Sequence, residues 1–83
     1  MDKVLLGIHA PTIQEVYDAF VPIDVPIREL VPIIADGLTE ISDGKYGVSR
    51  LEMVSLKDPE SLLDPKMTLR EYNIKDGMQL YFL

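Results

Sequence analysis

The segment that decides the expected fold is Thr68-Leu-Arg-Glu-Tyr-Asn-Ile-Lys-Asp-Gly-Met-Gln-Leu-Tyr-Phe-Leu83. Thr68 and Glu71 have the spacing of a capping box, which predicts a short helical turn over Leu69–Tyr72. Asp76-Gly77 is a strong signal for a tight turn. The near-continuous apolar run Met78–Leu83 then predicts a last strand that lies in the centre of a sheet.

Two strands are predicted near the N-terminus. Lys3–His9 is short, apolar and partly β-branched, and Ala10-Pro-Thr breaks it. Glu15–Val21 follows, and its alternation allows either of two sets of side chains to face the core. One of them would bury Asp18 without a partner, which costs several kcal/mol, so we expect the other phase. The side chains that then face the core are Tyr17, Ala19 and Val21.

The segment Val25–Leu38 carries the long helical pattern of the chain. The residues that align on one face are Ile27, Leu30, Ile34 and Leu38. Pro26 fits the first helical position, where its missing N–H costs nothing. Pro32 and Gly37 oppose a regular helix. We therefore expect one helix, kinked near Pro32 and frayed near Gly37.

The C-terminal half predicts three more strands. Val48–Leu56 alternates, and we expect Leu51 and Met53 to face inward and Val54 outward. Ser61–Leu63 is expected to be a short edge strand. The resulting order is β-β-α-β-β-β, with a short helical turn before the last strand. This order predicts an α+β protein with a mixed sheet packed on one helix, the β-grasp arrangement, in a single domain of residues 1–83.

The alternation along each expected strand divides the sheet into two faces. The inner face would carry Val4, Leu6, Ile8, Tyr17, Ala19, Val21, Leu51, Met53, Leu80 and Phe82. The apolar residues of the outer face would be Leu5, Phe20, Val54, Tyr81 and Leu83. Exposed apolar residues that gather on a small domain often mark a binding site, so this set is the candidate protein-binding surface. Tyr81 is its best single anchor, because tyrosine combines contact area with a polar group.

Composition and charge narrow the classes of partner. The 83 residues are 47% hydrophobic, lack cysteine and have a formal net charge of −6. The charge argues against nucleic acid or an anionic membrane surface as the main partner and is compatible with a basic protein surface. The longest apolar run, Leu30–Ala35, is far shorter than the roughly 20 residues of a membrane span. With no secretory signal visible, we expect a cytoplasmic protein.

No catalytic or metal-binding pattern is found in the sequence. His9 is the sole histidine, and without cysteine no Cys-His or Ser-His-Asp arrangement is convincing. No His, Asp or Glu cluster has ligand spacing, and the acidic residues Asp58, Glu60 and Asp64 are expected to be a solvated loop. We therefore expect no enzymatic activity, cofactor or metal.

Two segments resemble known families. Thr68-Leu-Arg-Glu-Tyr-Asn-Ile74 resembles the last third of ubiquitin. Tyr17-Asp-Ala-Phe-Val-Pro-Ile-Asp-Val-Pro-Ile-Arg-Glu-Leu30, together with the final strand, resembles the YukD/EsaB-type ubiquitin-like proteins associated with type VII (WXG100/ESX-like) secretion. That resemblance implies a cytoplasmic, non-conjugated accessory or adaptor protein that binds other proteins, such as components of the secretion machinery. Ubiquitin continues beyond its last strand into a Gly-Gly tail, whereas this sequence stops at Leu83.

Two alternative functions remain open on the sequence. The chain could be a small β-grasp structural subunit of a multicomponent enzyme, as in some oxygenases. A conjugatable modifier or a sulfur carrier is tenable if the native chain extends past Leu83. Neither the identity of the partner nor self-association follows from the sequence.

Overall fold

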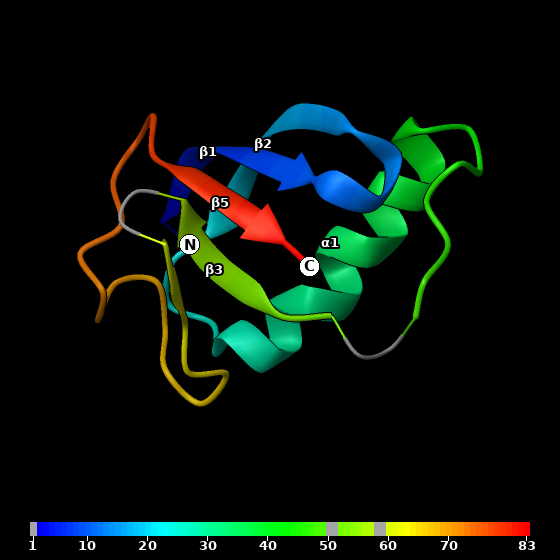
Figure 1. The fold of residues 1–83 in the computed structure, drawn as a ribbon. Coiled ribbons are helices and arrows are strands. Elements are labelled where there is room, and N and C mark those ends of the chain that lie inside the picture. The colour runs from blue at the N-terminus through cyan, green and yellow to red at the C-terminus, as the bar shows by residue number, and fades with distance from the viewer. Residues whose placement is uncertain (1, 50–51, 58–59) are drawn as a thin grey trace.

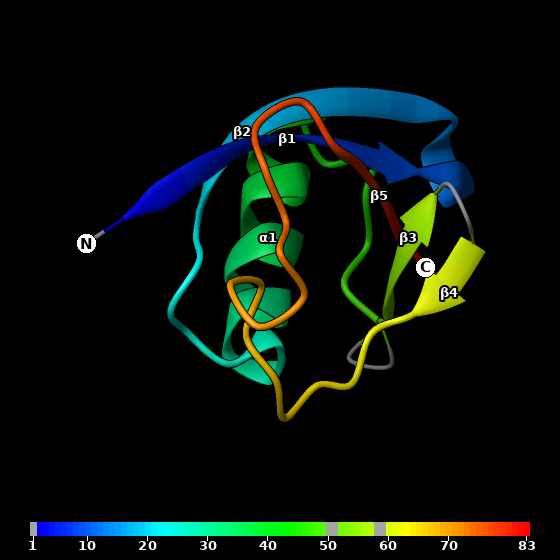
Figure 2. The same ribbon diagram turned by 90° about the vertical axis from the view of Figure 1, so that its left-hand side faces the viewer.

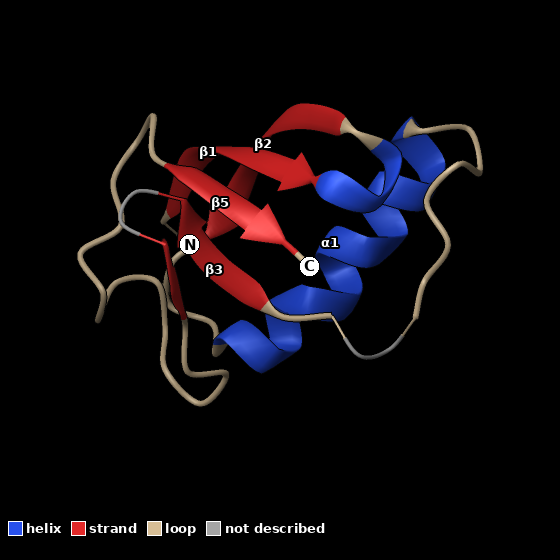
Figure 3. Ribbon diagram, viewed as in Figure 1, coloured by secondary structure: helices blue, strands red, loops and turns tan. Residues whose placement is uncertain are grey.

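The computed structural model describes residues 2–49, 52–57 and 60–83, which form a sheet with a long helix against one face (Figure 1, Figure 3). In chain order the elements are β1 (Lys3–Ala10), the short 3-10 helix η1 (Pro11–Ile13), β2 (Glu15–Pro22), α1 (Ile27–Ile41), β3 (Val54–Lys57), β4 (Glu60–Leu62) and β5 (Gln79–Phe82). The predicted order of strands and helix is confirmed.

The five strands lie in the order β2-β1-β5-β3-β4. β1 pairs antiparallel with β2 and parallel with β5, whereas β3 pairs antiparallel with both β4 and β5. The first and last strands therefore lie side by side in the middle of a mixed sheet, as predicted. Figure 2 shows β1 and β2 passing over α1, with β3 and β4 beside it.

The Asp76-Gly77 turn holds the start of β5 against β1. The backbone N–H of Leu5 donates to Oδ1 of Asp76 over 2.8 Å, and the N–H of Gly77 donates to the carbonyl of Leu5 over 2.9 Å. Gly77 has φ of +88°, a left-handed conformation that favours glycine. The predicted turn is thus confirmed. The side chain of Asp76 and the backbone of Gly77 both contribute to the pairing of β1 with β5.

Helix α1 differs from its prediction at both ends. Pro26 has ψ of 139° and is the capping residue before the helix, so the first helical residue is Ile27. The expected fraying near Gly37 is wrong, because α1 continues to Ile41. The adjacent Leu38 is buried, and its packing outweighs the cost of Gly37, which is about 1 kcal/mol relative to alanine. Pro32 lies inside the helix with its side chain exposed, and the kink there stays a prediction.

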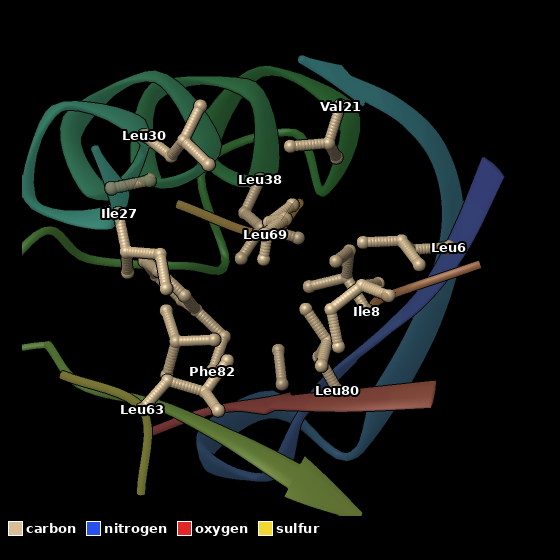
Figure 4. Close-up of a cluster of buried hydrophobic side chains, with 14 of the residues drawn as sticks. Leu6, Ile8, Val21, Ile27, Leu30, Leu38, Leu63, Leu69, Leu80 and Phe82 are labelled. Atoms are coloured by element: carbon tan, nitrogen blue, oxygen red, sulfur yellow. The ribbon is translucent and has the colours of Figure 1, made fainter. Parts of the chain in front are cut away.

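The core lies between α1 and the inner face of the sheet (Figure 4). Its buried apolar residues are Val4, Leu6, Ile8, Ala10, Val21, Ile27, Leu30, Ala35, Leu38, Tyr46, Val54, Leu63, Leu69, Ile74, Leu80 and Phe82. The phases predicted for β1, β2 and β5 are confirmed, with Tyr17 and Ala19 partly buried against this core.

The predicted strand Val48–Leu56 is wrong in extent and in phase. β3 begins at Val54, which lies opposite Phe82 of β5 and is 4% exposed. Met53, expected inside, is 53% exposed. Leu51 lies outside the described residues. The register with β5 decides the phase, because Val54 must share the face of its partner Phe82.

The turn before β5 is built as its spacing predicts. The N–H of Thr68 donates to Oε1 of Glu71 over 2.9 Å, and the N–H of Glu71 donates to Oγ1 of Thr68 over 3.2 Å, a reciprocal capping box. The turn buries Leu69 and Ile74, the first of them beneath α1 in Figure 4. The N–H of Ile27 donates to the carbonyl of Met67 over 2.8 Å, which joins this segment to the start of the helix.

Tyr46, which is absent from the predicted set of inner-face residues, is part of the core. Its backbone N–H donates to Oγ of Ser42 over 3.0 Å, and its hydroxyl donates to a carboxylate oxygen of Glu52 over 2.9 Å. Its ring lies 5.9 Å from that of Phe82, centroid to centroid. Burial and the hydrogen bond to Glu52 raise the pKa of Tyr46 well above its ordinary value of 10.0.

Val54→Asp should unfold the protein or lower its free energy of unfolding by at least about 3 kcal/mol, because it buries a carboxylate without a partner. Met53→Asp is the matched control at the exposed neighbour and should change that free energy by less than about 1 kcal/mol. Urea unfolding followed by circular dichroism measures both. Equal effects of the two variants would contradict the described phase of β3.

The raised pKa of Tyr46 predicts a loss of stability at high pH. The folded state favours the neutral phenol, so this contribution is complete below the unfolded value near pH 10 and is lost as pH rises through the higher folded pKa. The wild type and Tyr46→Phe are each titrated and followed by ultraviolet absorbance. The difference between the two titration curves reports the ionisation of the Tyr46 phenol. Its ionisation should occur above pH 10 and coincide with unfolding, whereas ionisation near pH 10 in the folded protein would refute its burial.

Candidate protein-binding surface

The side of the sheet that points away from α1 is called the outer face here. It consists of the residues that alternate with the core residues along each strand. They are Lys3, Leu5, Gly7 and His9 of β1, Val16, Asp18, Phe20 and Pro22 of β2, Ser55 and Lys57 of β3, Leu62 of β4, and Gln79 and Tyr81 of β5, with Met53 and Leu83 beyond the strand ends.

One row of the outer face crosses all five strands. The residues paired side by side in it are Val16, His9, Tyr81, Ser55 and Leu62. Adjacent strands are about 4.8 Å apart, so the row is about 19 Å long. Tyr81 lies at its centre and contacts His9 edge to face, with ring centroids 5.6 Å apart. A half-buried tyrosine is thus placed between apolar residues at both ends of the row.

Four of the five predicted surface residues lie where the sequence analysis placed them. Leu5 is half-buried and lies opposite Phe20, which is 70% exposed. Tyr81 is half-buried, and Leu83 is exposed opposite Met53, with which it exchanges two backbone hydrogen bonds. Val54 is the exception, because it faces the core and cannot contact a partner.

Three exposed apolar residues of the outer face were missed. Met53 was assigned to the core because the phase of β3 was predicted in reverse. Leu62 and Val16 lie at the two ends of the central row, and both are exposed. The alternation along Glu15–Val21 already placed Val16 outward, so that residue could have been found from the sequence. Leu62 required the pairing of β4 with β3.

A polar side chain covers the middle of the outer face. Gln79 lies over Gly7, and a Cβ added to Gly7 would come within 2.2 Å of Oε1 of Gln79. The same oxygen is 2.7 Å from Nε2 of His9, and the amide nitrogen of Gln79 donates to the carbonyl of Gly77 over 3.1 Å. The absence of a side chain at Gly7 therefore leaves the space that the end of the Gln79 side chain occupies.

Neither a metal site nor a membrane-spanning helix is present among the described residues. They contain no cluster of three or more His, Asp or Glu side chains placed to hold a metal ion. None of their helices combines the length and the apolar character needed to cross a membrane.

The fold defines the class of protein, a ubiquitin-like β-grasp. The ubiquitin-like domain of the Mycobacterium tuberculosis type VII secretion system protein EccD1 superimposes with a TM-score of 0.80 at 15% identity, covering 100% of this chain and 99% of that chain. The EccD5 ubiquitin-like domain from Mycobacterium xenopi gives 0.68 at 21% identity, covering 100% and 94%. A chain of the MycP5-free ESX-5 inner membrane complex gives 0.72 at 17% identity, covering 100% of this chain and 21% of that one.

The family follows from the sequence match. Residues 6–82 match the family described as WXG100 protein secretion system (Wss), protein YukD, and the chain belongs to that family. A search of curated proteins finds no match. The resemblance predicted from residues 17–30 and from the final strand is thus confirmed.

Gly7→Ala should displace the Gln79 side chain and break its contact with His9, because the new Cβ needs the same space. The flexible end of Gln79 can move, so the melting temperature should change little. The side-chain amide signals of Gln79 and the ring signals of His9 in the NMR spectrum report the displacement. Gly47→Ala is the control, since a Cβ there meets nothing within 4 Å. Unchanged Gln79 and His9 signals in Gly7→Ala would refute the described arrangement.

Proposed function

We propose that the protein is a cytoplasmic, non-conjugated accessory adaptor of a type VII secretion system and that it binds a protein partner through the outer face of its sheet. The observation that carries this proposal is the row centred on Tyr81, in a chain that belongs to the YukD family. Residues 1–83 act as one binding domain in this proposal, and the adaptor has no catalytic role.

The geometry of the outer face supports protein binding. Phe20 and Leu62 lie on opposite edge strands and are both largely exposed, with Tyr81 between them. Tyrosine near the centre of an interface contributes much of the binding energy in many complexes, and aromatic residues including phenylalanine are enriched at interfaces. Gln79 and His9 add hydrogen-bonding groups beside Tyr81 in the middle of this face, and interfaces commonly combine such groups with aromatic side chains.

The comparisons support the choice of partner. A domain of the same fold occurs within a longer chain of the ESX-5 inner membrane complex, so this fold is compatible with a place in a secretion machine. We therefore infer that the partner is a protein component of that machinery. Family membership favours this role over that of an oxygenase-type enzyme subunit.

Site-specific photo-crosslinking tests the surface and the partner together. A benzoylphenylalanine at position 62, an exposed outer-face position on β4, should crosslink to a component of the secretion machinery in cells that natively make the protein. Position 48 is the control, because Val48 is also an exposed apolar residue but lies outside the sheet. Because the proposed adaptor is not conjugated, its binding without irradiation is non-covalent, and denaturant should release the partner completely. Equal crosslinking from both positions, or a partner that stays attached in denaturant, would contradict the proposal.

Tyr81→Ala should weaken binding to the crosslinked component by about tenfold or more, because it removes the central aromatic contact. Val48→Ala should leave the affinity unchanged. Isothermal titration with the purified component measures both, and a thermal melt of each variant confirms that the fold is retained. Wild-type affinity in Tyr81→Ala would show that the outer face is not the binding surface.

A further inference from the structure

A second surface, separate from the Tyr81 row, lies where the edge strand β2 passes over α1. An apolar groove of about 110 Å³ opens there, between the inner side of β2 and one face of the helix. Ala19 and Gly37 line it from opposite sides, and Phe20, Ile33 and Ile41 border it. Ile33 and Ile41 are 60% and 59% exposed, although they belong to the face of α1 that continues into the core. Figure 2 shows β2 at the edge of the sheet above α1.

Gly37 is not required by packing within the domain. A Cβ added at this position would meet nothing within 4 Å, and no left-handed backbone conformation calls for glycine there. Glycine is nevertheless among the poorest residues for a helix interior. Its effect in this structure is to leave the groove open opposite Ala19, the small half-buried residue of β2.

The backbone of β2 presents hydrogen-bonding groups along the groove. The N–H of Ile23 donates to the carbonyl of Asp2 over 3.1 Å, which continues the ladder between β2 and β1. Backbone groups of an antiparallel strand alternate in direction, so Val16, Asp18 and Phe20 point theirs toward the open edge. Pro22 shares this direction, at a place where a missing N–H costs no ladder bond. Free backbone groups of this kind pair with an extended chain.

The negative charge around the groove favours a positively charged ligand. Residues 4–44 hold seven acidic residues and one basic residue, Arg28, whereas the rest of the chain holds seven of each. The segment that builds the β1–β2 hairpin and α1, residues 3–41, holds six acidic residues against Lys3 and Arg28, so it carries a net charge of −4 out of the −6 of the whole chain. Glu29, Asp36 and Glu40 are exposed on α1 next to Ile33, and Asp18 is exposed on β2. The ion pairs of the described residues are those of Arg70 with Asp2 and Asp24, so none neutralises these four carboxylates.

We propose that the β2–α1 groove binds an extended peptide segment of another protein, with alternating apolar residues flanked by lysine or arginine. The peptide adds as a strand to the free edge of β2, and every second side chain enters the groove over Gly37. The carboxylates of β2 and α1 contact its basic flanks. A second copy of this chain is disfavoured as occupant, because it would bring the same negative charge to the interface.

The test uses a synthetic peptide, Lys-Lys-Val-Ile-Val-Leu-Lys-Lys with blocked ends, titrated into the ¹⁵N-labelled protein. The amide signals of Val16, Asp18, Phe20 and Gly37 should shift together and saturate. Replacing the four lysines by glutamate, or the central isoleucine by proline, should weaken binding by at least about tenfold. Shifts confined to the outer-face residues of β1, β3 and β5, no shifts at these four amides, or equal binding of the glutamate peptide would overturn the proposal.

Gly37→Leu is the most informative variant. It fills the groove while improving helix propensity, so it should keep or raise the melting temperature and weaken peptide binding by at least about tenfold. The double variant Asp36→Lys, Glu40→Lys changes exposed residues alone and should weaken binding without altering the groove. Wild-type affinity in either variant would overturn the proposal. Peptide-free dimerisation that shifts the same amides would identify a second copy as the occupant instead.

Discussion

Strand β5 pairs in parallel with β1 and antiparallel with β3, and this double pairing joins the N-terminal hairpin to the β3–β4 hairpin in one sheet. Its alternation directs Leu80 and Phe82 into the core and Tyr81 to the outer face. A shift by one residue would exchange these roles and expose the core side chains. The Asp76-Gly77 turn, bonded to Leu5, fixes the register at the start of the strand. The position of the candidate binding residue is therefore set by the same contacts that complete the fold.

The sequence predicts the parts of this fold that depend on local patterns. The capping box of Thr68 and Glu71, the Asp76-Gly77 turn and the phase of β2 each follow from neighbouring residues. Local patterns could not predict which side chains of β3 face the core. Met53 and Val54 are both apolar, and only the pairing of Val54 with Phe82 distinguishes them. Burial of Tyr46 was likewise missed, since Phe82 and Glu52 hold it from other parts of the chain. For the same reason the binding surface was predicted with Val54 in it and without Leu62.

The two surfaces differ in chemistry and so would select different partners. The outer face presents aromatic and aliphatic side chains in a row around Tyr81, with the backbone of its inner strands already paired. The β2–α1 groove presents unpaired backbone groups, an open apolar space over Gly37 and a border of carboxylates. A folded partner suits the first surface, and an extended basic segment suits the second. Because the row around Tyr81 and the groove over Gly37 lie on different sides of β2, one domain of this size would have room for two bound segments at once.

Secretion by the native cell tests the central claim, that β5 presents a functional contact through Tyr81. A strain lacking the chromosomal copy would express the wild type, Tyr81→Arg or Val48→Arg at equal levels, and export of the small WXG100-type substrates would be measured in the medium. All three proteins should be folded, because both positions face solvent at least in part. The account predicts that the wild type and Val48→Arg restore export and that Tyr81→Arg does not. Full export with a folded Tyr81→Arg protein would contradict it.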